Sequence, residues 1–451
     1  MKKNIFFVLM IVIICAAVQS KQKAAAYPLP GVKSGLRVII EPANQLYGVP
    51  FSLRITGLKA NEQVTVTAQS IDAARVEWQS SAVFKADAKG TVYVNRTAPV
   101  SGDYSGVDSL GLLWSMNPIK YEGKRVPTYE YERSIDYITV RISAAASAGK
   151  TAAAVMHRYF HMPGSALVRV PLQQDGLEGY LYYPAEGGPH PGLIILSGSD
   201  GGLHEWLAQV IASNGFAALT LAYWGYRDLP KELVEIPLEY FQKAIAWMKR
   251  QKAIRTERLA VVGGSKGGEL ALLLGATYPD IKVVVAWVPS GITWKGISQQ
   301  RSGSSWSLNG KGLPYIPWTF TQEDAIKWEK GELHSFRHLY ALDKIDPVAI
   351  DKATIQVEKI KGPVLLVSGT DDQTWPSSDF CDMVMQRLEK FKHPYEYKHL
   401  KYEEAGHKVF LPYLITGGSR SFIGGTPKAN AHGGMNSWAE TLDFLHRHLD
   451  Q

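Results

Sequence analysis

The 451-residue sequence predicts a protein in which an all-β sandwich is followed by a larger α/β domain. From Leu36 to about Ser143, short segments of alternating polar and apolar residues are separated by turn residues, as in a sandwich of two sheets. After Arg158, apolar strands alternate with helical patterns, which is typical of a mostly parallel sheet with helices on both faces. The hydrophobic share of 45% and the charged share of 20% are those of a globular protein long enough for two cores.

Individual segments place the elements of each domain. In the first domain, which we assign to residues 35–155 and expect to be immunoglobulin-like, the clearest strand patterns are Leu36–Ile40, Phe51–Ile55 and Val64–Ala68. In the second domain, residues 156–451, buried strands are expected near five positions: Gly192, Ala217, Leu259, Val283 and Val364. The Ala/Ser/Gly-rich stretch Ala144–Ala154 predicts the boundary between the domains.

The amino terminus predicts an export signal. Two lysines precede an unbroken apolar run of 14 residues, Ile5–Val18, and small residues follow it. Fourteen residues are short for a membrane span, so we interpret residues 1–20 as a cleaved signal peptide and residues 21–34 as a linker. The protein is therefore expected to be secreted, periplasmic or in the cell envelope, and an uncleaved anchor is the alternative. A lipid anchor at Cys15 is disfavoured because the bulky Ile14 precedes it.

Cysteine content and charge restrict the classes of partner. Loss of the signal peptide would leave Cys381 as the only cysteine, which excludes an internal disulfide. The same loss would lower the formal net charge from +7 to +5. A mildly basic chain is compatible with an anionic substrate and equally with an ordinary solvated surface. No basic run interleaved with aromatic residues is present, so nucleic-acid binding is not expected, and membrane contact is expected only through the signal.

The most informative motif is Gly263-Gly-Ser265-Lys-Gly267, a Gly-x-Ser-x-Gly pattern between a predicted buried strand and a predicted helix. Its glycines allow a turn too sharp for a Cβ atom, and this turn lifts the serine hydroxyl above the sheet edge. The first N–H groups of the helix point to the same place, where they can stabilise a developing negative charge. Ser265 is therefore the candidate nucleophile, although the five-residue pattern alone also fits a small-residue packing turn.

A nucleophilic serine needs a base and an acid that orients the base. Asp371 and Asp372 follow the apolar strand near Val364, at the carboxyl end where the sites of open α/β sheets lie. We favour Asp372, three residues after Gly369 and four before Pro376, because this position is the expected tip of the loop. The alternative is a pair of capping aspartates in a solvated turn.

Of the 12 histidines, His407 has the position expected of the base. It follows Gly406 in a loop after the strand-like segment Tyr395–Leu400, and it lies 35 residues beyond Asp372. That interval accommodates one helix, one strand and their loops, so the last strand would bring His407 beside the serine. The chain order Ser265, Asp372, His407 is that of a triad on an open α/β sheet.

A glycine-rich loop, Gly198–Gly202, follows the strand near Gly192 and can approach the serine without obstruction by side chains. The backbone N–H groups of Ser199 or Asp200, together with that of Lys266, would form an oxyanion hole there. The loop lacks the Gly-x-Gly-x-x-Gly spacing of a dinucleotide site. Neither a metal nor an organic cofactor is expected.

Distinctive segments occur in both halves of the chain: Ser101–Met116, Leu221–Pro230, Leu238–Phe241, Gly-Gly-Ser265-Lys-Gly-Gly-Glu-Leu and Gly406-His407-Lys. On these segments the chain resembles, over almost its whole length, the family of acyl-CoA thioesterases and bile acid-CoA:amino acid N-acyltransferases. The resemblance implies an α/β-hydrolase fold for the second domain. It also implies that Ser265, Asp372 and His407 are the nucleophile, acid and base. Asp200 departs from the glycine expected in the family's oxyanion loop.

Together these observations predict a serine hydrolase that cleaves acyl thioesters of the acyl-CoA type, or related small-molecule acyl esters, through an acyl-enzyme. An acyl-CoA:amino acid N-acyltransferase is the alternative within the family, whose acyltransferases carry cysteine as the nucleophile. Export raises another alternative, a carboxylesterase or amidase, because coenzyme A esters are cytoplasmic metabolites. A binding protein with a vestigial hydrolase half is the non-enzymatic alternative, which the intact ordered trio disfavours.

Between Gly291 and Trp328 the alternation of strands and helices breaks into a segment rich in Ser, Gly, Trp and Pro. An insertion at this place is where hydrolases of this architecture have lids and acyl-pocket walls. An irregular, packed excursion is the alternative.

Overall fold

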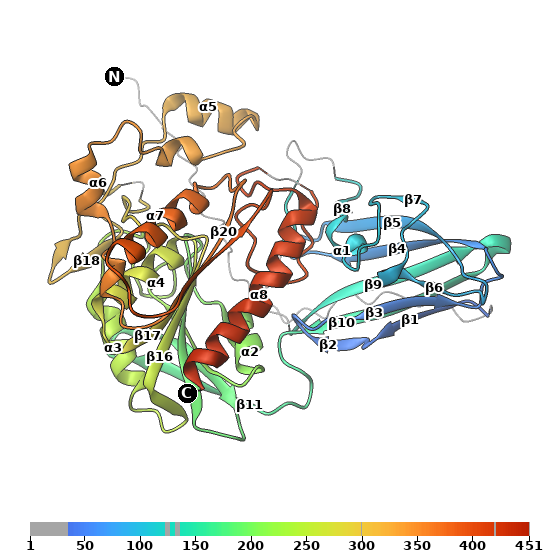
Figure 1. Cartoon of the computed structure of the whole chain (residues 1–451), viewed down its shortest axis with the longest axis horizontal. Helices are drawn as coiled ribbons and strands as arrows, with labels where there is room; N and C mark the ends of the chain where they lie inside the picture. Colours follow the sequence, from blue (N-terminus) through green and yellow to red (C-terminus); the bar gives the residue numbers. More distant parts are fainter. Residues whose placement is uncertain (1–34, 122–126, 131–135, 299, 419–420, 451) are drawn as a thin grey trace.

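The computed structural model describes residues 35–121, 127–130, 136–298, 300–418 and 421–450. It contains a β-sandwich and an α/β-hydrolase domain side by side (Figure 1). The predicted signal peptide and linker, residues 1–34, lie outside the described residues, so export stays a prediction. Within the described ranges, no helix is both long and apolar enough to cross a membrane.

The β-sandwich consists of a three-stranded sheet, β1-β3-β6, and a larger sheet, β2-β10-β9-β4-β5-β7, in which β8 also pairs with β5. Every second residue of β4 and β5 is buried, as the alternating sequence pattern predicts. The elements of this domain are β1 (Arg37–Glu41), β2 (Asn44–Leu46), β3 (Ser52–Thr56), β4 (Gln63–Ile71), β5 (Glu77–Lys85), β6 (Val92–Tyr93), β7 (Ser101–Gly102), α1 (Gly111–Trp114), β8 (Asn117–Pro118), β9 (Tyr137–Ala146) and β10 (Thr151–Tyr159).

The stretch Ala144–Ala154, predicted as the domain boundary, instead forms the turn and flanks of a β-hairpin. β9 and β10 pair antiparallel along their length, and the chain turns between them at Ser147–Gly149. The small side chains fit the interior of the sandwich, where Ala144 is buried, so they serve packing rather than flexibility. The chain leaves this sheet only after Tyr159 and joins the next sheet at Leu167, so the predicted boundary at residue 155 falls inside β10.

The second domain is built on one eight-stranded sheet of order β11-β12-β14-β13-β16-β17-β20-β21. The pairings β11–β12 and β12–β14 are antiparallel, and the remaining ones are parallel. All five predicted strands are present. The strands are β11 (Leu167–Gln174), β12 (Leu177–Pro184), β13 (His190–Leu196), β14 (Ala217–Ala222), β16 (Ile254–Gly264), β17 (Ile281–Trp287), β20 (Val364–Gly369) and β21 (Tyr397–Tyr402).

Helices cover both faces of this sheet, because its central strands are buried on both sides. Ile194 and Leu196 of β13 belong to the same hydrophobic cluster as residues of α3, α4 and α7, whereas Leu193 and Ile195 belong to the cluster that includes residues of α2 and α8. The helices are α2 (Glu205–Ala212), α3 (Leu238–Met248), α4 (Lys266–Thr277), α7 (Ser377–Lys390) and α8 (Pro427–Leu449).

Helix α8 also joins the two domains. Figure 1 shows it between the sheet and the sandwich, with α1 beside it. The Nε2 atom of His432 in α8 lies 2.9 Å, within hydrogen-bond distance, from Oδ2 of the buried Asp108, just before α1. Ala431 and Met435 of the same helix pack into the core of the sandwich. The two domains therefore share a packed interface.

In the segment between Gly291 and Trp328, residues 291–298 and 303–308 are largely packed, whereas most of residues 309–328 are exposed. Trp306 and Ile316 are fully buried, and Ile316 belongs to an aromatic cluster with Trp294 and Trp375. A role as an acyl-pocket wall stays a prediction. The short elements in and around this segment are β15 (Ile236–Pro237), β18 (Trp306–Leu308), β19 (Lys311–Gly312), α5 (Gln322–Lys330) and α6 (Pro347–Ala353).

Candidate active site

The predicted site residues lie at one edge of the parallel sheet. Ser265 directly follows β16, and the loop beginning at Gly198 follows the adjacent strand β13. Asp372 follows β20, and His407 follows β21, the last strand. Because parallel strands have their carboxyl ends at the same edge, the topology brings all four loops to one place.

The backbone of Ser265 has a conformation that side-chain-bearing residues rarely adopt. Its φ is 57° and its ψ is −123°. Three hydrogen bonds hold it: its N–H donates to the carbonyl of Trp287 (2.8 Å), and its own carbonyl accepts from Gly268 N–H (2.9 Å) and Glu269 N–H (3.1 Å). A strained, half-buried serine between a strand and a helix is the geometry of a nucleophile elbow.

The flanking glycines are required by close backbone contacts. A Cβ atom on Gly263 would lie 2.1 Å from the carbonyl oxygen of Gly267. A Cβ atom on Gly267 would lie 2.4 Å from the carbonyl oxygen of Ser197, which belongs to the neighbouring strand end. Both distances are too short for real atoms, so the predicted reason for the Gly-x-Ser-x-Gly pattern is confirmed.

The structure pairs His407 with Asp372. The Nδ1 atom of His407 lies 2.8 Å from Oδ2 of Asp372, whose side chain is fully buried. The same carboxylate accepts hydrogen bonds from Thr374 N–H (2.9 Å), Trp375 N–H (3.3 Å) and the Ser377 hydroxyl (2.6 Å). A buried carboxylate with this many donors is fixed in place and compensated for its loss of water.

Asp371, the other candidate acid, faces a different group. Its carboxylate accepts hydrogen bonds from Gly425 N–H (2.9 Å) and from the Gln373 side chain (2.6 Å). It is exposed and ties the acid loop to the segment that follows His407. The geometry therefore agrees with the preference for Asp372 and gives Asp371 a bracing position.

The backbone of the His407 loop is held by groups that the sequence did not reveal. Asn430 of α8 accepts the N–H of Gly406 through its side chain at 2.6 Å, and His407 N–H donates to the carbonyl of Ile423 at 2.7 Å. The indole of Trp375 stands edge-on to the imidazole, with 6.2 Å between ring centroids. Asn430 and Trp375 belong to no recognisable motif, so only their position in the fold shows their role.

This arrangement determines the tautomer of His407. An ionised carboxylate can only accept hydrogen bonds, so Nδ1 carries the proton that it donates to Asp372. In the neutral ring Nε2 is then unprotonated and can act as a base. Within the described ranges, no three His, Cys, Asp or Glu side chains are grouped so as to bind a metal ion.

The predicted oxyanion loop lies against the elbow. A Cβ atom on Gly198 would be 3.5 Å from the Cβ of Ser265 and 3.0 Å from the carbonyl oxygen of Gly264. Ser199 and Asp200 follow directly. The carboxylate of Asp200 accepts the N–H of Gly198 at 3.0 Å and pairs with His204 Nε2 at 3.0 Å. The side chain at the unexpected Asp200 is therefore engaged with its own loop.

Lys266, the other predicted oxyanion donor, has a buried side chain. Its Nζ lies 2.7 Å from both carboxylate oxygens of Glu269, and Trp306 donates its indole N–H to the same carboxylate at 2.7 Å. All three residues are at most 5% exposed. Burial lowers the pKa of Lys266 and raises the pKa of Glu269, while their mutual attraction opposes both changes.

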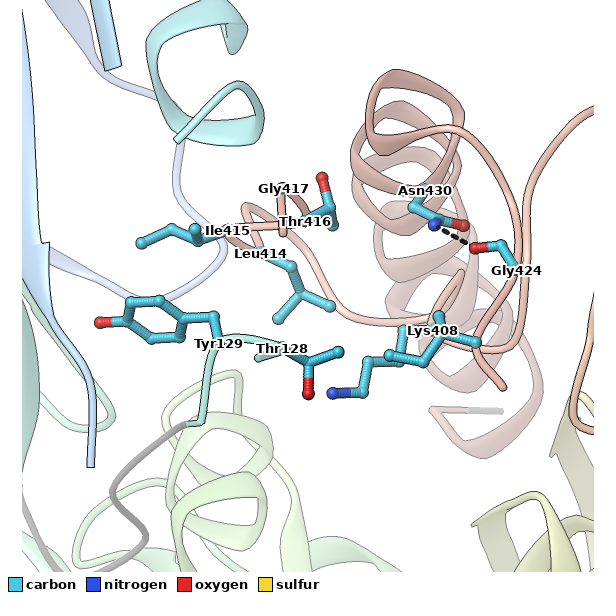
Figure 2. Close-up of a pocket in the computed structure, with 10 residues that line it drawn as sticks. Thr128, Tyr129, Lys408, Leu414, Ile415, Thr416, Gly417, Gly424 and Asn430 are labelled. Carbon is cyan, nitrogen blue, oxygen red and sulfur yellow. Dashed lines mark hydrogen bonds between the residues drawn. The ribbon is translucent and has the colours of Figure 1, made fainter. Parts of the chain in front are cut away.

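A small pocket lies where the two domains meet, beside Lys408 and Gly424 of the segment that follows His407 (Figure 2). The sandwich contributes Thr128 and Tyr129, and the hydrolase domain contributes Lys408, Gly424 and Asn430 among others. Figure 2 shows the side chain of Asn430 donating to the carbonyl of Gly424, at 3.0 Å. The pocket thus borders the backbone that holds the histidine loop.

Two family models match the chain. Residues 48–172 match the acyl-CoA thioester hydrolase/BAAT N-terminal region, and residues 236–451 match the BAAT/acyl-CoA thioester hydrolase C-terminal region. Rat acyl-coenzyme A amino acid N-acyltransferase 2 is 32% identical over 92% of this chain and 99% of its own length. The acyl-coenzyme A thioesterases 1 of mouse and human are 29% and 28% identical over 91% of this chain and 96% of theirs.

Removing either member of the Lys266–Glu269 pair should make the free energy of unfolding depend on pH, and the direction should be opposite in the two variants. In Lys266→Met, the buried Glu269 has a pKa above its ordinary 4.5, so stability is lost as pH rises above that value. In Glu269→Gln, the buried Lys266 has a pKa below its ordinary 10.5, so stability is lost as pH falls below that value. Each change should cost about 3–5 kcal/mol where the remaining group is charged.

Urea unfolding at pH 6 and pH 9, referred to wild type at each pH, measures this effect. Lys266→Met should be closer to wild type at pH 6, and Glu269→Gln at pH 9. Parallel profiles for the two variants would contradict a buried, mutually dependent ion pair.

Proposed function

Because the chain belongs to the acyl-CoA thioester hydrolase and bile acid-CoA:amino acid N-acyltransferase family, we propose that it hydrolyses acyl thioesters of the acyl-CoA type or related acyl esters. In this proposal Ser265 is the nucleophile. The observation that carries this proposal is the His407–Asp372 pair at the sheet edge where the strained Ser265 stands. The family membership supports a thioesterase-like enzyme, and the proposal adds which of its residues take part in the reaction.

In the first step, the Ser265 hydroxyl attacks the acyl carbonyl and gives its proton to Nε2 of His407. Asp372 stabilises the resulting imidazolium through the 2.8 Å contact with Nδ1 and does not itself take the proton. The carbonyl oxygen becomes an oxyanion, which the N–H of Lys266 and an N–H of the loop at Ser199 or Asp200 would bind. The intermediate then expels the thiolate or alkoxide, which His407 protonates, and an acyl-serine remains.

In the second step, water attacks the acyl-serine while His407 accepts one of its protons. The acyl group leaves as a free acid, and the returned proton restores the Ser265 hydroxyl. All groups required come from this chain and from water. The relatives named above act as thioesterases or as N-acyltransferases, so the acceptor of the acyl group is the open choice.

Serine at position 265 favours water as that acceptor. An acyl-cysteine is a thioester, which amines attack much more readily than water does. An acyl-serine is an oxygen ester, a poorer electrophile toward amines, which a histidine-activated water can still hydrolyse. Transfer to an amino acid is the second candidate function, and the similarity to the rat N-acyltransferase favours it.

Substitution within the trio tests the proposed roles. Ser265→Ala and His407→Ala should each lower kcat by about 10⁴ to 10⁶, and the double variant should lose little more because the residues act as a unit. Asp372→Asn should lower kcat by about 10³ to 10⁴, because the imidazole would adopt the wrong tautomer. Asp371→Asn is the matched control and should retain most of the activity. Rates with a common acyl-CoA substrate measure all five variants.

Two results would contradict these assignments. If Ser265→Ala kept more than a tenth of wild-type activity, serine catalysis at this position would be wrong. If Asp371→Asn lost more activity than Asp372→Asn, the acid would be Asp371.

The products distinguish hydrolysis from acyl transfer. With acyl-CoA and excess glycine or taurine, the wild-type protein should release mainly free acid. Ser265→Cys should turn over more slowly but with a larger amide fraction, because its acyl-enzyme is a thioester. Mass spectrometry of the products measures both fractions, and mostly N-acyl amino acid from the wild type would reject the hydrolase proposal.

A further inference from the structure

We propose that Trp306 and Tyr223 form a positioning network that fixes the distance between the two backbone segments of the oxyanion hole. One segment is the start of α4 at Lys266, and the other is the loop after β13 at Ser197 and Gly198. The inference rests on the proposed function, because it assigns a role in the same reaction to residues that do not touch the reacting atoms. It is carried by an unbroken series of contacts between the two segments.

The series begins at the elbow. The side chain of Lys266 is bound by Glu269 one turn further along α4, and the N–H of Glu269 donates to the carbonyl of Ser265 at 3.1 Å. The first turn of the helix is thereby closed twice, once through the backbone and once through side chains. This closure fixes the direction of the Lys266 N–H, which the proposed mechanism aims at the oxyanion.

Trp306 continues the series from outside the helix. Its indole N–H binds the Glu269 carboxylate at 2.7 Å, and its backbone lies in β18, which pairs with β15 at Ile236. Its ring contacts the ring of Tyr223, with 5.9 Å between centroids. Trp306 is completely buried and Tyr223 is 1% exposed, so neither ring has space to move independently.

Tyr223 completes the series at the other segment. Its hydroxyl donates to the carbonyl of Ser197 at 2.6 Å, directly before the oxyanion loop. The next residue, Trp224, donates its indole N–H to the carbonyl of Gly198 at 3.3 Å and accepts the N–H of Gly202 at 3.1 Å. The loop is therefore held at both ends by residues that follow β14.

Stability alone gives no reason for this arrangement. A buried ion pair loses its hydration, and well-packed apolar residues of similar volume often stabilise a protein as much or more. A cation in the first turn of a helix also faces the unfavourable end of the helix dipole. Correct placement of oxyanion donors, in contrast, has a large effect on rate, since a displacement of about 1 Å can cost about 10²-fold.

The network also assigns an indirect role in the reaction to the insertion between Gly291 and Trp328. Trp306 is supplied by this insertion, so the segment contributes to the rigidity of the oxyanion hole from behind, in addition to any contact with the acyl group.

The test removes the two hydrogen-bonding groups of the ring pair, the Trp306 indole N–H and the Tyr223 hydroxyl; a Trp-to-Phe control elsewhere accounts for the loss of ring volume. Trp306→Phe removes the indole N–H, and Tyr223→Phe removes the hydroxyl. Each should lower kcat with decanoyl-CoA about tenfold while KM changes less than about twofold. Each should weaken binding of an alkyl trifluoromethyl ketone, which forms a tetrahedral adduct with serine, by a similar factor. The double variant should lose less than the product of the single losses.

Two buried residues outside the network provide matched controls. Trp78→Phe removes an indole N–H that binds the carboxylate of Asp72 at 2.9 Å in the sandwich. Tyr129→Phe removes a hydroxyl that lies 2.6 Å from the hydroxyl of Ser70, also in the sandwich. Both should keep kcat and the affinity for the ketone within about twofold of wild type, even if the proteins melt at lower temperature.

The outcomes separate the two proposals. If Trp306→Phe and Tyr223→Phe fold and behave like their controls, or if they change KM and ketone affinity without kcat, the positioning network is wrong while serine catalysis stands. Where Trp306→Phe does not fold, Tyr223→Phe alone decides. If Ser265→Ala retains decanoyl-CoA hydrolysis, both the network and the proposed function are overturned.

Discussion

The left-handed backbone of Ser265, with a φ of 57°, is the constraint on which the rest of the site depends. It places a side chain at the sheet edge only because no Cβ atoms stand at Gly263 and Gly267, where they would collide with neighbouring carbonyls. The same turn starts α4 at once, so the helix N-terminus and the serine occupy one point in space. Both the proposed nucleophile and half of the proposed oxyanion hole thus follow from one strained residue.

The remaining groups reach that point because the sheet is parallel. β20 and β21 end at the same edge as β16, and their loops carry the buried Asp372 and the adjoining His407. Each loop is fixed by a side chain at or near the start of the helix that follows it: the Ser377 hydroxyl of α7 donates to Asp372, and Asn430 of α8 accepts the N–H of Gly406. Since α8 also packs against the sandwich, the amino-terminal domain is mechanically connected to the histidine loop.

Sequence patterns predicted the fold class and the principal candidates, because strand periodicity and the Gly-x-Ser-x-Gly turn are local signals. They also ranked Asp372 above Asp371, which agrees with the geometry. The sequence patterns gave a wrong domain boundary because strand pairing, which they do not show, determines the structure there. Ala144–Ala154 resembles a linker in composition but pairs as a hairpin. The roles of Trp306, Tyr223 and Asn430 could not be predicted, since their partners Glu269, Ser197 and Gly406 lie at least 24 residues away.

The central claim is that the acyl group passes through a covalent bond to Ser265. The most direct measurement is intact-protein and peptide mass spectrometry after rapid acid quenching of the protein mixed with excess acyl-CoA. The account predicts an adduct with the mass of the acyl group on the peptide that contains Ser265, formed in wild type and absent from Ser265→Ala. An adduct on another residue, or acid release from wild type with no adduct under conditions in which deacylation is slowed, would contradict it.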